Sequence, residues 1–328
     1  MSLDAHSTAD RDIPQLSTSP ASAGASPLPR SDIALDTVEA EHWVQTSESY
    51  AFIEGPAFDR HDNLIFSMPL DGRVMSLSPD RKLRTLVSRN DRGSAGLAIH
   101  KDGRIFIASA GDFTKGGSIM TVQADGSDLT YIVSPQKGLL PNDIVFDRHG
   151  GFYFSDFRGT STKPAGGVYY IAPEGGEPVS ILPNLAMGNG VALSPDDRQL
   201  WVTEFSRNLL HRITLTDPTT VAPFGTAIAY SFVGPAPDSI RTDSAGNVYV
   251  ALFGQGRVMI FSPGGIPIGQ ILLPRRDEGH NLICTSLAIR PGTNEVYIVA
   301  SDGDRGLAAN IFRARGYAKA LALYSHAS

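Results

Sequence analysis

Cysteine is almost absent from this chain, because Cys284 is the only one among 328 residues. A single cysteine excludes a disulfide within the chain, and proteins without disulfides are typical of reducing compartments. We therefore expect a cytoplasmic location. Cys284 lies in a strand-like apolar run, residues 281–285, where cysteine usually packs as a small hydrophobic side chain. A catalytic thiol is thus not the favoured interpretation.

Long hydrophobic runs are also missing. No stretch of about eighteen consecutive apolar residues occurs, so no membrane-spanning helix is expected. The first thirty residues or so are rich in Ser, Ala, Pro and Thr, and they contain no apolar segment typical of a secretory signal. Such a stretch buries too little apolar surface to order itself. We expect a disordered tail over residues 1–32 and a single folded domain over residues 33–328.

The chain has no excess of positive charge. Its 28 Lys and Arg residues face 34 Asp and Glu residues, which gives a formal net charge of -6. Because nucleic-acid binding needs a basic surface, this balance argues against nucleic acid as a partner. Mild acidity suits a site for a hard cation, although simple solubility is the better explanation of the charge alone. Helical patterns are scarce too: the best candidate, residues 318–323, lacks capping residues and is as easily an edge strand.

What the chain does contain is a short pattern that recurs six times. Each unit has an apolar strand, a tight turn rich in Asp, Asn, Gly or Pro, and a second strand. Successive units start 41 to 49 residues apart, which is the spacing of propeller blades with four strands each. The sequence therefore predicts an all-β fold, a six-bladed β-propeller closed around a central channel. We also expect a strand over residues 41–46 that pairs with the end of the chain and joins the ring.

One aligned position in the six units carries mostly polar side chains. It lies five residues before the residue that opens the turn, and it is occupied by Glu54, Ala95, Asn142, Asn189, Asp238 and Thr285. Because the innermost strand of each blade lines the channel, these residues should form a ring around the axis. Four of them carry carboxylate or amide oxygens, which are costly to bury without partners.

A hard cation at the axis would satisfy these oxygens. Calcium accepts six to eight oxygen ligands in flexible geometry, and Mg²⁺ or Mn²⁺ could substitute for it. Zinc fits poorly because the ring has no His or Cys. The other interpretation is that these Asn and Asp side chains only cap turns and bind backbone groups.

Three further residues are candidates for the site. Ser239 directly follows Asp238 and could add an oxygen ligand. Arg158 could bind an anionic part of a substrate or brace a loop. His280 precedes the sixth inner strand and could reach the mouth of the channel as a proton carrier, although a loop histidine without a catalytic role is more common.

Several stretches resemble the SMP-30/gluconolactonase-like family of calcium-dependent six-bladed propellers. The similar stretches are residues 99–104, 151–159, 200–204, 237–239, 254–258 and 267–272. The resemblance extends from Glu54 to the C-terminus. It implies that Glu54, Asn142, Asn189 and Asp238 bind the metal, with Ser239 as a further ligand in part of the family. It also implies that Asp238 transfers the proton.

The expected function is that of a calcium-dependent lactonase acting on small-molecule lactones. The cation would polarise the lactone carbonyl, and Asp238 would act as general base on a water molecule. Attack by Asp238 itself as a nucleophile remains open. The alternatives are a phosphotriesterase at the same metal site and a non-catalytic, calcium-stabilised binding propeller. The fold alone does not choose among them.

Overall fold

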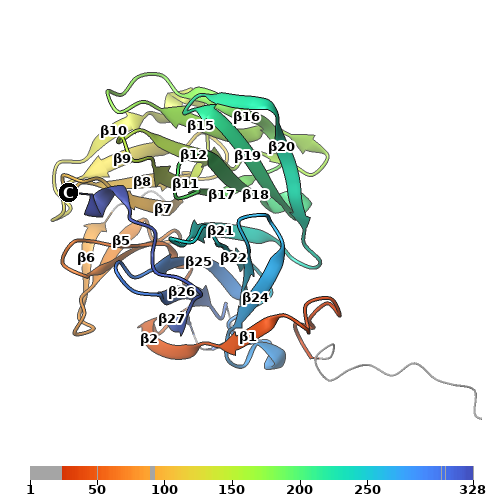
Figure 1. Ribbon diagram of the computed structural model, residues 1–328. Helices are drawn as coiled ribbons and strands as arrows, with labels where there is room; N and C mark the ends of the chain where they lie inside the picture. Colours follow the sequence, from red (N-terminus) through yellow and green to blue (C-terminus); the bar gives the residue numbers. More distant parts are fainter. Residues whose placement is uncertain (1–23, 50, 89–92, 304, 307, 328) are drawn as a thin grey trace, which may run out of the picture.

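Six antiparallel sheets stand around one axis as the blades of a propeller (Figure 1). The computed structural model describes residues 24–327 except residues 50, 89–92, 304 and 307. The innermost strands of neighbouring blades contact one another in a closed circle, as the expected six-bladed all-β fold requires.

From the channel outwards, the strands of the six blades are as follows. The first three blades contain β3 (Glu54–Phe58), β4 (Leu64–Met68), β5 (Arg73–Leu77) and β6 (Leu83–Ser88); β7 (Ser94–Ile99), β8 (Ile105–Ser109), β9 (Ser118–Val122) and β10 (Thr130–Val133); and β11 (Pro141–Phe146), β12 (Phe152–Asp156), β15 (Gly166–Ile171) and β16 (Val179–Leu185). The last three contain β17 (Gly188–Leu193), β18 (Gln199–Glu204), β19 (Leu209–Asp217) and β20 (Thr220–Ser231); β21 (Pro237–Thr242), β22 (Val248–Leu252), β23 (Arg257–Phe261) and β24 (Pro267–Leu272); and β25 (Ile283–Ile289), β26 (Glu295–Ser301), β27 (Ala309–Arg315) and β2 (Glu41–Ser47).

Three of the turns after the inner strands are fixed by an aspartate at the residue that opens the turn. Asp59 Oδ1 accepts hydrogen bonds from the backbone N–H groups of His61 and Asn63 at 2.9 and 2.8 Å. Asp147 and Asp243 bind their own turns in the same way. Such local bonds set the length of the turn and hence the register of the two strands.

The core consists of six apolar clusters, one at each interface between neighbouring blades. Val202 of the fourth blade packs with Tyr153 of the third, and Phe66 of the first packs with Val299 of the sixth. Both faces of every sheet are therefore buried. This explains why the strands are continuous runs of Val, Ile, Leu and aromatic residues rather than alternating polar and apolar residues.

The ring closes by pairing the two ends of the chain. β2 forms the outermost strand of the sixth blade by antiparallel pairing with β27, as expected for residues 41–46. β1 (Asp36–Glu39) adds in parallel to β24 at the edge of the fifth blade. The expected tail over residues 1–32 is too long, because Ser26, Leu28 and Asp32 are buried against the propeller. Residues 1–23 lie outside the described part of the chain.

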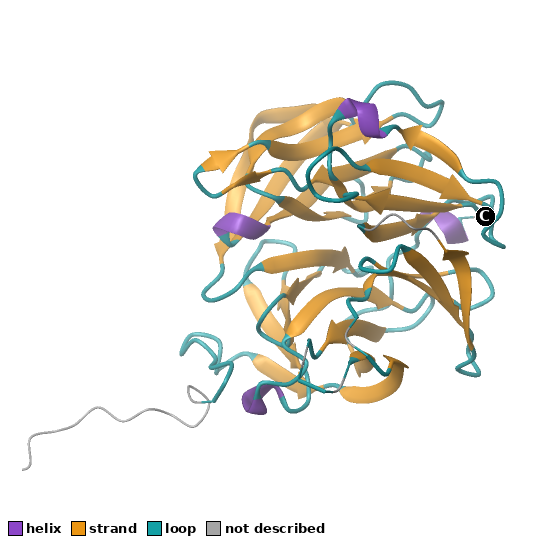
Figure 2. Ribbon diagram, turned by 180° about the vertical axis from the view of Figure 1, so that it is seen from behind, coloured by secondary structure: helices purple, strands orange, loops and turns teal. Residues whose placement is uncertain are grey.

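Strands and loops make up nearly all of the molecule (Figure 2). A small hairpin, β13 (Gly159–Thr160) and β14 (Lys163–Pro164), extends from the third blade, and the helical turns are η2 (Pro135–Lys137), η3 (Phe205–Arg207), η4 (Arg276–Glu278) and η5 (Tyr324–His326). Within the described residues no helix has the length and apolar character needed to cross a membrane. Residues 318–323 are neither a helix nor a strand: Ala320 forms one bridge to Asp243, and the segment continues into η5.

A buried ion pair fastens the N-terminal segment to the fifth blade. Arg257 is 1% exposed, and its Nη2 lies 2.9 Å from Asp32 Oδ2. Its other nitrogens donate to Gln255 and Gln270. Because both charges are out of water, removing one leaves the other without compensation.

We predict that Asp32→Asn lowers the free energy of unfolding by about 3–5 kcal/mol, since it leaves the buried Arg257 charge unpaired. Asp71→Asn is the control, because it breaks an exposed pair with Arg73 and should cost less than about 1 kcal/mol. Urea unfolding measures both values. Equal effects of the two substitutions would show that the Asp32–Arg257 pair does not fasten this segment.

Candidate functional site

Each inner strand breaks its pairing with the second strand at or beside the aligned ring position. In the third blade, for example, regular pairing is interrupted between Pro141 and Ile144, and the other five inner strands have a register shift at the equivalent place. A β-bulge of this kind re-aims the side chains within it. Alignment of the six repeats of this chain located the position, but it did not reveal the bulge.

Close packing of neighbouring inner strands accompanies the bulges. Gly190 follows Asn189, and a Cβ atom there would lie 2.6 Å from the backbone nitrogen of Ile240 and 2.7 Å from the backbone oxygen of Asp238. No side chain fits such a gap, so glycine allows the fourth and fifth blades to meet. Thr203 Oγ1 then joins them, because it accepts from Gly190 N–H at 2.7 Å and donates to the Asp238 carbonyl at 2.6 Å.

Glu54 and Asp238 are two carboxylates enclosed at the start of the inner strands. Asp238 is 4% exposed, and Glu54 keeps part of its surface open. Burial, reinforced by repulsion from Asp143, raises the pKa of Glu54 from 4.5 to about 8. Burial and repulsion from Glu54 raise the pKa of Asp238 well above its ordinary value of 3.8. The two groups therefore lie close enough to oppose each other's ionisation.

Asn189 supplies an oxygen that lacks a partner. Its side chain is 2% exposed, its amide hydrogen-bonds to Asp238, and its Oδ1 has no hydrogen-bond partner. An unpaired buried acceptor next to two carboxylates is the arrangement that a cation would relieve. Asn142, at the equivalent position of the third blade, is partly exposed. Two carboxylates and two amides at these four positions would be a donor set that fits a hard divalent cation.

The four candidate ligands at the ring include only two acidic side chains. Within the described residues, no three His, Cys, Asp or Glu side chains are grouped in a way that could hold a metal ion by themselves. A cation at this position would therefore need the amide oxygens of Asn142 and Asn189 as well. Ser239 is 1% exposed and lies next to Asp238. The remaining ring positions, Ala95 and Thr285, carry no carboxylate or amide.

Three other carboxylates hold the loops that lead into the inner strands. Asp156 accepts the backbone N–H of Leu140 at 3.0 Å, and Glu204 accepts that of Ala186 at 2.7 Å. Asp302 does the same for the backbone of the loop before β25, at 2.8 Å. All three carboxylates are buried. Through these hydrogen bonds they fix the loops that lead into β11, β17 and β25.

Arg158, the candidate for binding an anionic part of a substrate, and His280, the candidate proton carrier, are partners of two of these carboxylates. Arg158 Nε donates to Asp156 Oδ2 at 2.7 Å, and His280 Nδ1 lies 2.9 Å from Asp302 Oδ2. Arg158 also lines a hollow of about 270 Å³, together with Phe113, Phe157 and Met187. Among the described residues, His280 has no hydrogen bond to a ring side chain. Arg158 thus lies beside this hollow, and His280 has a bracing contact with Asp302.

Five phenylalanines form a chain of ring contacts on the loops at this end of the blades. We call them the phenylalanine collar: Phe52, Phe113, Phe157, Phe205 and Phe253. Their consecutive ring centroids are 5.6 to 6.4 Å apart. Phe157, Phe205 and Phe253 each directly follow the second strand of a blade, so they lie at the rim where the inner strands begin. Sequence reasoning missed the collar, although a Phe after three equivalent strands was the available signal.

Cys284 packs as expected from its apolar surroundings. It is fully buried in the cluster between the fifth and sixth blades, and burial raises the pKa of its thiol. A protonated, inaccessible thiol is not a nucleophile.

Comparison with known proteins identifies the family. Residues 52–301 match the family described as SMP-30/Gluconolactonase/LRE-like region. The chain belongs to this family. It is 43% identical over 312 residues to lactonase drp35 of Staphylococcus saprophyticus. The matched region covers 94% of this chain and 96% of the relative. The chain is 42% identical over 314 residues to lactonase drp35 of Staphylococcus aureus, with the same coverage.

Solved structures of SMP-30/gluconolactonase proteins share the fold. A calcium-binding protein, regucalcin, from Agrobacterium tumefaciens superposes with a TM-score of 0.71 at 17% identity, over 87% of this chain and 98% of that protein. A gluconolactonase from Xanthomonas campestris superposes with a TM-score of 0.67 at 19% identity, over 82% and 87%. At such identities the likeness establishes the propeller and not its substrate.

The raised pKa of Glu54 predicts how the cation-free protein responds to pH. Between the ordinary pKa of 4.5 and the folded value of about 8, the folded protein holds a proton that the unfolded chain releases. The stabilisation is therefore present below about pH 4.5 and is lost as pH rises towards 8. In chelator, the free energy of unfolding should fall on the order of 5 kcal/mol more over this range in the wild type than in Glu54→Gln. Identical pH profiles of the two proteins would contradict the burial of this carboxylate.

Proposed function

We propose that this chain is a lactonase that hydrolyses small lactones at the axial site, with a divalent cation, preferably calcium, held by Glu54, Asn142, Asn189 and Asp238. The observation that carries the proposal is the pair of mutually repelling carboxylates, the partly exposed Glu54 and the buried Asp238, beside the unpartnered Asn189 Oδ1. The reaction class is supported by relatives named lactonase that align with 94% of the chain.

When bound, a divalent cation supplies Lewis-acid polarisation of an ester carbonyl. Glu54 and Asp238 provide two negative charges that match the charge of the ion. The amide oxygens of Asn142 and Asn189 are ligands of the kind that calcium prefers, and the Ser239 hydroxyl is the further candidate. Mg²⁺ and Mn²⁺ also take oxygen ligands, so either could substitute for calcium.

Asp238 is the proposed general base. It would take a proton from a water molecule as the water oxygen bonds to the lactone carbonyl carbon, and the proton would then pass to the alkoxide released when the ring C–O bond breaks. A carboxylate with raised proton affinity suits this role, whereas ligation of a cation weakens it. Asp238 would therefore need one oxygen free of the cation. Direct attack by Asp238 would instead form a covalent ester on this residue.

The phenylalanine collar limits which class of lactone we propose as the substrate. Phe157, Phe205 and Phe253 present hydrocarbon at the rim, and Arg158 at the nearby hollow is already paired with Asp156. A polyhydroxylated lactone would leave its hydroxyl groups without partners against such a surface. We propose that lactones with a hydrocarbon body are preferred.

The first test compares hydrolysis by the wild type and by Asp238→Ala, each with calcium and after chelation. We expect chelation to abolish turnover of small lactones and Asp238→Ala to lower kcat/KM by at least about 100-fold, because the base is lost. Asp197→Ala is the control, since Asp197 is paired with Arg148 on the surface.

The same assay includes an organophosphate triester. Turnover of the triester far above that of any lactone would make the protein a phosphotriesterase instead. Absence of chelator-sensitive turnover with both substrates would contradict an enzymatic role and favour a calcium-stabilised binding propeller.

The second test addresses the collar. Phe205→Ser removes apolar contact at the rim, so KM for a lactone with a hydrocarbon body should rise about tenfold, whereas KM for a hydroxylated sugar lactone should change little. Phe224→Ser is the matched control, because Phe224 is fully exposed on the outermost strand β20. Equal changes for the two substrates would exclude the collar as the determinant of specificity.

A further inference from the structure

An arginine and an aspartate form a salt bridge between two inner strands beside the ring residues. Arg241 Nη1 of β21 lies 3.0 Å from Asp143 Oδ2 of β11, 98 residues away in the sequence. Asp143 directly follows Asn142, and Arg241 comes three residues after Asp238. The Asp143 side chain is fully buried, and that of Arg241 is 17% exposed.

Hydrogen bonds turn Asp143 away from a role as a ligand. Its Oδ1 accepts the N–H of Ile144 at 2.9 Å, and its Oδ2 accepts the N–H of Val191 at 3.4 Å as well as the guanidinium of Arg241. Its backbone N–H donates to Ser155 Oγ at 3.0 Å. Both oxygens are therefore occupied, and the contacts join the third, fourth and fifth blades.

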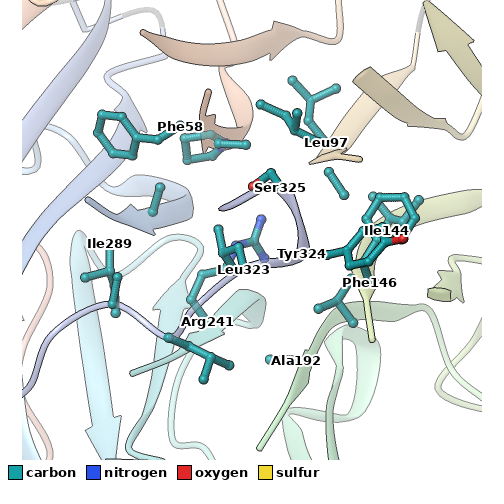
Figure 3. Close-up of a pocket in the computed structure, with 18 of the residues that line it drawn as sticks. Phe58, Leu97, Ile144, Phe146, Ala192, Arg241, Ile289, Leu323, Tyr324 and Ser325 are labelled. Atoms are coloured by element: carbon teal, nitrogen blue, oxygen red, sulfur yellow. The ribbon is translucent and has the colours of Figure 1, made fainter. Parts of the chain in front are cut away.

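The surroundings of Arg241 on the other side of the pair are mostly apolar. Arg241 lines a cavity of about 80 Å³ formed by the later halves of the inner strands and by the C-terminal residues Leu321, Leu323 and Tyr324 (Figure 3). This cavity lies toward the opposite ends of the inner strands from the ring residues. Charges in such a low-dielectric setting act over longer distances than charges in water.

Both members of the pair act on the ring. Asp143 opposes the ionisation of Glu54 and of Asp238, whereas Arg241 favours the ionisation of Glu54. Without Arg241, three uncompensated carboxylates would be enclosed together. Without Asp143, a lone guanidinium would lie beside the position where a cation is expected.

We propose that Arg241 neutralises the charge of Asp143 beside the ring. The two negative charges of Glu54 and Asp238 are then left to bind a divalent cation. Arg241 and Asp143 are thus positioning residues whose opposite charges set the affinity for the ion. This inference rests on the cation of the proposed function, but it concerns different residues and has its own readout.

The experiment is a double-mutant cycle on cation affinity. Calcium is titrated calorimetrically into chelated and desalted protein at about pH 9, where most carboxyl groups are ionised. We expect Asp143→Asn to raise Kd at least about tenfold, because the charge of Arg241 then repels the ion. Arg241→Met should lower Kd by a similar factor, and the double variant should return within about threefold of the wild type. Arg241→Lys, which keeps the charge, should stay near the wild type.

A purely structural role would give a different pattern. Both single variants would then bind calcium more weakly, and the double variant would bind no better than either, which would overturn the inference. Thermal unfolding and circular dichroism of each variant in chelator identify any that fail to fold, and the Arg241→Lys titration then tests the charge effect alone. Absence of calcium binding by the wild type would overturn the proposed cation itself, and the charge-balance inference with it.

Discussion

The constraint on which the rest of the structure depends is the break in register at the start of every inner strand. A regular strand alternates its side chains between the two faces of a sheet, and both faces of each blade are buried against neighbouring blades. Polar residues on a regular inner strand would therefore enter the apolar interfaces. The bulge removes this conflict, because it frees one aligned residue per blade from the alternation. Six blades then place six such residues around the axis.

At the ring position, the protein brings together polar groups whose charges and hydrogen bonds are not fully balanced by other protein groups. Glu54 accepts one hydrogen bond from Gly55, and Asp238 accepts from Asn189, but the two carboxylates repel each other and Asn189 Oδ1 has no partner. Other carboxylates nearby have cationic partners. Asp143 is bound by Arg241 and by two backbone N–H groups, and Asp156 is bound by Arg158. The contrast between satisfied and unsatisfied groups supports a ligand at the ring and a structural role around it.

The repeat in the sequence was enough to predict the propeller, its blades and the closing strand. Turn residues such as Asp59 and Asp243 are local signals, and the aligned ring position follows from them. The Arg241–Asp143 pair and the contact between Phe157 and Phe205 could not be predicted in this way, because each depends on how different blades meet. The bulges lie within single blades, but they depend on the register of two strands, which the residue pattern does not specify. The contact between His280 and Asp302, 22 residues away, likewise joins two separate loops.

The most direct test of the central claim is a crystal structure of the protein grown with calcium, with anomalous difference density used to locate the ion. The account predicts one strong peak on the axis, with oxygens of Glu54, Asn142, Asn189 and Asp238 about 2.3–2.6 Å away, as calcium coordination requires. A calcium ion bound elsewhere, or a ring whose carboxylates stay paired with protein groups in the presence of calcium, would contradict it.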